Sequence, residues 1–224
     1  MASHIDGYDI ADGAIAGARA AAAAAGLDNL HYHVADLERL ELPEASYDLI
    51  FGFQSVHHIS DLDRLCRMVR RALRPGGVFH LHEYVGPDRF QWTDAQLSHM
   101  NGFLLTLPER YHRLPDGIVR GPRERPLAAD VIACDPTEAV RSSQIVATVE
   151  RHFKVLARHD LGGALLHIGL SDIAQNFDPD NPVDMAHLNR FFALEDRLMA
   201  EGVIGSDFLV MTVLKPEEPG AMAA

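Results

Sequence analysis

Short apolar runs alternate with longer stretches of helical periodicity along residues 5–84. Apolar runs of strand length cover 5–10, 30–34, 47–53 and 78–84, and amphipathic stretches of helical length cover 11–25 and 61–73. The run YDLIFGF at 47–53 is almost continuously apolar, which is typical of a strand covered on both faces. Strands that alternate with helices predict an α/β fold with a doubly wound, mostly parallel sheet.

The remainder of the chain is less regular. Its pattern predicts helices over 90–105, 137–152 and 181–201 and strands over 153–159 and 207–214. A segment rich in proline, glycine and arginine separates the first two helices, and a loop this long in a compact domain is usually functional or mobile. We expect a single domain over 1–224, with a substrate-covering insertion over 86–152 and a flexible tail over 215–224.

Composition and charge argue against several classes of function. The chain has 224 residues, 47% of them hydrophobic, and a net charge of −12, which argues against nucleic-acid binding. The arginines at 64–74 have helical spacing, which indicates a solvated helix face. No apolar run reaches the roughly 18 residues that a membrane span needs. Cys66 and Cys134 lack the spacing of a disulfide framework or a zinc site, and we expect a cytoplasmic protein.

Polar side chains stand at the ends of three successive predicted strands. Asp9 ends the first, Asp36 follows the second, and Gly52-Phe53-Gln54 closes the third. These ends share one edge of a parallel sheet and can therefore surround one ligand. A carboxylate at Asp9 can accept hydrogen bonds from a ribose diol, and one at Asp36 from an adenine amine. Each also has a structural alternative, since Asp9 can cap a helix and Asp36 can belong to a turn.

The motifs over about 6–83 resemble those of class I S-adenosylmethionine-dependent methyltransferases. GYDIADGAI resembles the family's second-strand motif, YHVADLERLELPEASYDLIFGFQSVHHISDL its third and fourth strands, and VRRALRPGGVFHLHE its helix, Pro-Gly-Gly turn and fifth strand. The resemblance implies a Rossmann-like methyltransferase sheet, S-adenosyl-L-methionine as cofactor and a small-molecule methyl acceptor. It also implies cofactor contacts from six residues: Asp9, Ile10, Asp36, Leu37, Phe53 and Gln54.

Two histidines and a glutamate are candidates for the chemistry. His57 and His58 follow the strand 47–53, and Glu83 ends the strand 78–84 at the same edge. Because imidazole can act as a general base near neutral pH, we take His58 and Glu83 as the catalytic candidates. In the resembling family the histidine pair often borders cofactor and substrate instead. The adjacent rings diverge and no third ligand is evident, so we expect no metal site.

The segment after the strand 78–84 carries candidates for substrate binding. HEYVGPDRFQW holds a carboxylate, a phenol, a guanidinium and an indole within a few residues, and a later helix start adds Glu138 and Arg141. We expect substrate contacts from Tyr84, Arg89, Trp92 and Arg141. Trp92 can equally anchor the following helix, and Arg141 can belong to an internal ion pair. The mixed composition suits a small polar acceptor.

The family's first strand and its GxGxG-like loop should lie upstream of Ile5, where only MASH stands. We therefore expect a sheet truncated at its N-terminus, in which the flanking strands pair directly, a strand is borrowed from another chain, or the sequence is incomplete. Exposed strand edges favour a homo-oligomer such as a homodimer. Beside a methyltransferase, the alternatives are a non-catalytic remnant of the fold that serves as a binding or oligomerisation module and a nucleotide-dependent oxidoreductase.

Overall fold

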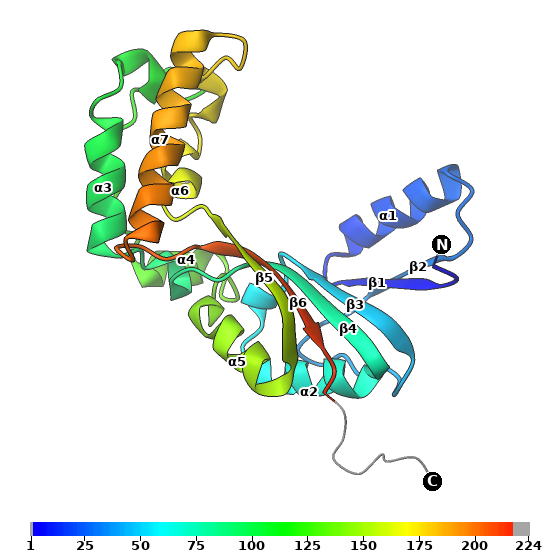
Figure 1. The fold of residues 1–224 in the computed structure, drawn as a ribbon. Helices are drawn as coiled ribbons and strands as arrows, with labels where there is room; N and C mark the ends of the chain where they lie inside the picture. The colour runs from blue at the N-terminus through cyan, green and yellow to red at the C-terminus, as the bar shows by residue number, and fades with distance from the viewer. Residues whose placement is uncertain (1, 217–224) are drawn as a thin grey trace.

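The computed structural model describes residues 2–216, and its strands form two sheets (Figure 1). The first sheet pairs β1 (Ile5–Asp9) with β2 (Leu30–Val34) in parallel. The second consists of β3 (Tyr47–Phe53), β4 (Leu73–Tyr84), β5 (Lys154–Gly162) and β6 (Phe208–Leu214), in the order β3-β4-β6-β5. β3 and β4 are parallel, whereas β6 runs antiparallel to both of its neighbours. The predicted α/β fold is confirmed, with a mixed main sheet.

Seven α-helices connect and flank these strands within residues 2–216. They are α1 (Asp12–Ala24), α2 (Leu62–Ala72), α3 (Asp94–Leu104), α4 (Ala128–Cys134), α5 (Ile145–His152), α6 (Leu166–Leu170) and α7 (Pro182–Ala200). Side-chain caps fix several starts: Asp61 accepts from the backbone of Arg64, and Thr93 forms a capping box with Gln96. None of the described helices is long and apolar enough to span a membrane.

One hydrophobic core lies between the four-stranded sheet and the helices α2 and α5, below the sheet in Figure 1. The buried side chains of α2 recur at intervals of three and four residues, which puts them on one face of the helix. This face consists of Leu62, Leu65, Cys66, Val69 and Ala72, and the strands contribute Phe79, Leu81, Met211 and Val213. The core therefore holds the sheet and the segment 56–72 in a fixed relation.

A second core joins α3, α6 and α7, at the upper left of Figure 1. Phe103 of α3 stacks on Phe191 of α7 with ring centroids 4.3 Å apart. The predicted insertion 86–152 does not coincide with this packing, because α5 belongs to the first core and α6 and α7 lie outside that range. The predicted tail 215–224 lies outside the described residues except for Lys215 and Pro216.

β1 and β3 each present an edge that pairs with no strand of residues 2–216. Of the three alternatives for the truncated sheet, the direct pairing of these two strands is therefore wrong. They touch through side chains: the Tyr47 hydroxyl donates to Asp6 at 3.0 Å and lies 3.2 Å from the Tyr8 hydroxyl. Leu49, Phe51 and Phe53 are each more than half exposed along β3.

Candidate functional site

The carboxyl ends of β1 and β2 bring two of the predicted cofactor residues side by side. Asp9 is the last residue of β1, and Asp36 comes two residues after the end of β2. The backbone N–H of Ala35 donates to the carbonyl of Asp9 at 2.8 Å, which extends the parallel ladder by one step. Asp9 and Asp36 therefore lie at one edge, as the sequence predicted.

The loop after β2 is tied to the segment that follows β3. The backbone N–H of Ser60 donates to the carboxylate of Glu38, and Arg64 donates to the carbonyl of Leu40 at 2.7 Å. Because Ser60 and Arg64 come just after the turn that ends β3, the ends of β2 and β3 lie at the same side of the molecule. Phe53 and Gln54 stand at this end of β3.

Each of the two carboxylates uses one oxygen to hold its own turn. Oδ1 of Asp9 accepts from the N–H of Ala11 at 2.7 Å, and Oδ1 of Asp36 accepts from the N–H of Glu38 at 2.9 Å. Within residues 2–216, Oδ2 of Asp9 has no further partner, and Oδ2 of Asp36 lies 3.6 Å from the exposed guanidinium of Arg39. Both carboxylates are oriented by the backbone and keep an oxygen for a ligand.

Apolar side chains flank these carboxylates. Ile10 is 70% exposed and Phe53 is 57% exposed, while Leu37 is partly buried against the first core. Gln54 has a φ of 47°, a left-handed conformation that is uncommon for a residue with a side chain and that recurs at binding sites. Ile10 directly follows Asp9 and Leu37 directly follows Asp36, so each oriented carboxylate has an apolar neighbour in the chain.

Glu83, a catalytic candidate, is fully buried and faces inward. One of its oxygens accepts from the N–H groups of Ser55 and Val56 at 2.5 and 2.7 Å, and the other lies 2.7 Å from Nδ1 of His57. Its carboxylate thus fixes the turn η1 (Val56–His58) and the His57 ring. Glu83 does not reach the surface, and its part in catalysis stays a prediction.

Glu138 faces the His57 nitrogen that does not contact Glu83, and the ring of His58 lies next to that of His57. Nδ1 of His58 lies 3.0 Å from the hydroxyl of Thr137. The carboxylate of Glu138 lies 3.6 Å from Nε2 of His57 and 4.0 Å from Nε2 of His58. Glu138 comes from a loop about 80 positions further along the chain, and no spacing in the sequence indicates that it lies against the histidine pair.

The four predicted substrate residues do not converge on one point. Tyr84 is buried and its hydroxyl donates to the carbonyl of Pro87, and Trp92 packs partly into the second core. Arg89 donates to the carbonyl of Glu138, close to the histidine pair. Arg141 donates to the carbonyl of Ser60 at 2.8 Å and to the side chain of Gln144. Their part in substrate binding stays a prediction.

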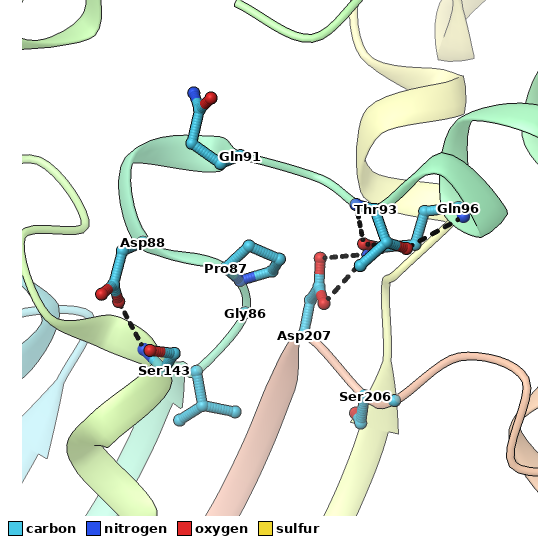
Figure 2. A pocket seen from close by; sticks show the side chains of 11 residues that line it. Gly86, Pro87, Asp88, Gln91, Thr93, Gln96, Ser143, Ser206 and Asp207 are labelled. Atoms are coloured by element: carbon cyan, nitrogen blue, oxygen red, sulfur yellow. Dashed lines mark hydrogen bonds between the residues drawn. The ribbon is translucent and has the colours of Figure 1, made fainter. Parts of the chain in front are cut away.

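An open hollow of about 540 Å³ lies beyond the end of β4 (Figure 2). It is lined by Val85–Asp88, Gln91, Thr93, Gln96, Ser143 and 205–207, and none of the predicted cofactor residues lines it. Figure 2 shows the carboxylate of Asp207 turned toward Gln96, whose side-chain nitrogen lies 3.1 and 3.2 Å from its two oxygens. The hollow is thus separate from the edge that carries Asp9 and Asp36.

Asp207 makes the free energy of unfolding depend on pH. Burial raises the pKa of its carboxyl to about 7, the buried carboxylate of Glu195 raises it further, and the hydrogen bond from Gln96 opposes the shift. Because the pKa in the folded state lies above the unfolded value of about 3.9, the free energy of unfolding falls as the pH rises from about 4 to 7. We expect Asp207→Asn to flatten this decline in urea unfolding measured at pH 5 and pH 8. An equal decline in wild type and variant would contradict the assignment.

Comparison with known proteins shows which family the N-terminal part of the chain is similar to. Residues 1–81 match the family model described as "Methyltransferase domain". A 58-residue segment is 34% identical to 27-O-demethylrifamycin SV methyltransferase of Amycolatopsis mediterranei strain S699, covering 26% of this chain and 21% of that protein. The chain thus spans far less than two thirds of the length of this curated relative.

Solved structures resemble the chain over almost its whole length. Phosphoethanolamine N-methyltransferase 2 of Haemonchus contortus in complex with S-adenosyl-L-methionine aligns with a TM-score of 0.55 and 17% identity, over 96% of this chain and 44% of that one. The [4+2]-cyclase SpnF aligns with a TM-score of 0.52 and 17% identity, over 96% of this chain and 67% of that one. Residues 1–81 are thus similar to the methyltransferase-domain family, and the chain has the fold of the class I S-adenosylmethionine-dependent methyltransferases.

Proposed function

We propose that the protein binds S-adenosylmethionine and transfers its methyl group to a small polar acceptor. The observation that carries the proposal is that two carboxylates oriented by the backbone, Asp9 and Asp36, lie together at the carboxyl ends of β1 and β2, with the exposed side chain of Ile10 directly after Asp9. These residues lie within the segment that matches the methyltransferase family. In this proposal Asp9 holds the ribose hydroxyls, Asp36 accepts from the adenine amine, and Gln54 borders the methionine part.

The chemistry asks little of the protein. S-adenosylmethionine supplies a methyl group activated on a sulfonium, so the protein mainly has to orient the acceptor and exclude water. In this proposal His58 faces the acceptor, and Glu83 acts through His57, whose ring it holds at 2.7 Å. In this proposal Arg89 and Arg141 supply positive charge near the loop that carries Glu138. Tyr84 and Trp92 support this region by packing.

A second candidate function is a non-catalytic binding or oligomerisation module. β1 and β3 each have an edge without a partner strand in the described part of the chain, and these edges and the exposed apolar side chains of β3 favour it. The similarity to SpnF, which is named a [4+2]-cyclase, also illustrates that this fold carries more than one function. In either case we propose a homo-oligomer joined through strand edges and a cytoplasmic location, in keeping with two free cysteines.

Ligand-dependent thermal unfolding tests the proposal and separates it from a nucleotide-dependent oxidoreductase. S-adenosylhomocysteine at 100 times its dissociation constant should stabilise the folded chain by about 2.7 kcal/mol, which raises the unfolding temperature by about 5 °C or more. NADH at the same concentration should leave it unchanged. A shift with NADH and none with S-adenosylhomocysteine would overturn the proposal, and no shift with either would favour the non-catalytic module.

A further inference from the structure

Three side chains with metal-ligand atoms converge beside the turn η1. They are His57, His58 and Glu138, which we call the His57–His58–Glu138 cluster. One ligand atom from each lies within 4.8 Å of the other two, and the carboxylate of Glu138 approaches Nε2 of both rings. The loop that carries Glu138 is joined to η1 by a hydrogen bond from the N–H of Val140 to the carbonyl of His57 at 3.1 Å.

Hydrogen bonding assigns the ring proton of neutral His57 to Nδ1. The partner of Nδ1 is a carboxylate oxygen of Glu83 at 2.7 Å, and the other Glu83 oxygen already accepts two backbone N–H groups. A carboxylate that accepts on both oxygens needs a donor at Nδ1. Nε2 of His57 therefore carries a lone pair, and it faces Glu138.

The same reasoning applies to His58. Its Nδ1 lies 3.0 Å from the hydroxyl oxygen of Thr137, and that hydroxyl donates its only proton to Asp135 at 2.6 Å. The hydroxyl can then only accept from His58, so the proton of the neutral ring is on Nδ1. Nε2 of His58 also carries a lone pair directed to the side of Glu138.

Two imidazole lone pairs and a carboxylate thus face one another at separations that no direct hydrogen bond spans. An imidazole whose second nitrogen donates to a carboxylate or another oxygen is the usual arrangement behind a metal ligand. Tetrahedral bonds of about 2.1 Å put ligand atoms about 3.4 Å apart, close to the 3.6 Å between His57 and Glu138. Exposed fractions of 34% for His58 and 26% for Glu138 leave one side open to further ligands.

We propose that His57, His58 and Glu138 bind a divalent transition-metal ion such as Zn²⁺. Two imidazoles and one carboxylate suit borderline metals of this class, whereas Mg²⁺ and Ca²⁺ prefer oxygen ligands alone. The role we assign to the ion rests on the proposed function: at its open positions it holds an oxygen of the methyl acceptor and lowers the pKa of that group. Binding of the ion itself does not depend on methyl transfer.

Cobalt absorption tests the site without cofactor or acceptor. The full chain is freed of metal with a chelator and titrated with Co²⁺. Saturable visible absorption at one equivalent, displaced by Zn²⁺, is the expected result. Because S-adenosylhomocysteine is not needed, failure of cofactor binding leaves this readout intact, and the two proposals fail separately.

Variants at the partly exposed ligands locate the ion. His57 is left unchanged, because its removal would strip Glu83 of a buried partner. Glu138→Gln and His58→Ala should each weaken Co²⁺ binding by at least about tenfold while the circular dichroism spectrum stays that of the wild type. The matched control is His152→Ala, whose ring pairs with Asp63 of α2 and does not belong to the cluster, so this variant should leave binding unchanged. No saturable absorption with the wild type, or equal affinity in wild type and Glu138→Gln, would overturn the proposal.

Discussion

Replacement of Glu83 by alanine is expected to lower the free energy of unfolding by about 3 kcal/mol or more. The buried carboxylate accepts from the N–H groups of Ser55 and Val56 and from Nδ1 of His57. Alanine would leave these donors buried without an acceptor, and each such loss costs about 1 to 3 kcal/mol. Urea unfolding followed by circular dichroism measures the effect.

Two further variants show whether the loss of stability comes from the unsatisfied donors or from the removal of a glutamate as such. Glu83→Gln keeps an oxygen that can accept the two backbone donors, so we expect a smaller loss than with alanine. Glu150→Ala removes an exposed carboxylate from α5 and should change the free energy of unfolding by less than about 0.5 kcal/mol. If Glu83→Ala proved as stable as Glu150→Ala, the positioning role of Glu83 would be wrong.

Replacement of Asp36 by alanine is expected to weaken binding of S-adenosylhomocysteine by about 10- to 100-fold. The lost interaction is a hydrogen bond to a charged acceptor, which contributes about 1.5 to 3 kcal/mol. Asp36 is partly exposed and holds only a local turn, so folding should survive the change. Equilibrium dialysis of labelled ligand gives both dissociation constants.

Asp48→Ala is the matched control for this prediction. Asp48 lies at the opposite end of β3 from Phe53, is 81% exposed, and pairs with Arg74 at 2.7 Å. Its removal changes the net charge by the same amount but touches nothing at the carboxyl edge. Equal weakening by both variants would indicate a general charge effect and would argue against an adenine contact at Asp36.

The sequence was sufficient for the elements whose residues match their local environment. The strands 30–34 and 47–53 were predicted with the observed bounds, because their apolar content and flanking turns agree. β4 begins at Leu73, earlier than predicted, because Leu73 already pairs with Tyr47; the Pro-Gly-Gly segment then forms an irregularity before Val78 pairs with Leu49. The five-residue helix α6 was missed, since its length shows no periodicity. The antiparallel direction of β6 was not predicted, because apolar alternation does not encode the direction of a strand.

The positions of site residues could be predicted where the order of strands determines them. They could not be predicted where contacts between distant segments determine them. Asp9 and Asp36 lie together because parallel strands end at one edge. Glu83 also ends a strand, but its side chain turns inward to serve the backbone of Ser55 and Val56, a contact between segments almost 30 positions apart. Glu138 reaches the histidine pair from a loop, so the third group of that cluster had no signal in the spacing of the sequence.

The central claim is that the edge bearing Asp9 and Asp36 holds the adenosine of S-adenosylmethionine. Calorimetric titration of S-adenosylhomocysteine into the full chain tests it most directly. We expect a saturable heat with one site per chain, weakened at least about tenfold by Asp9→Ala and by Asp36→Ala and unchanged by Asp48→Ala. No saturable heat with the wild type, or a heat that neither carboxylate variant alters, would contradict the account.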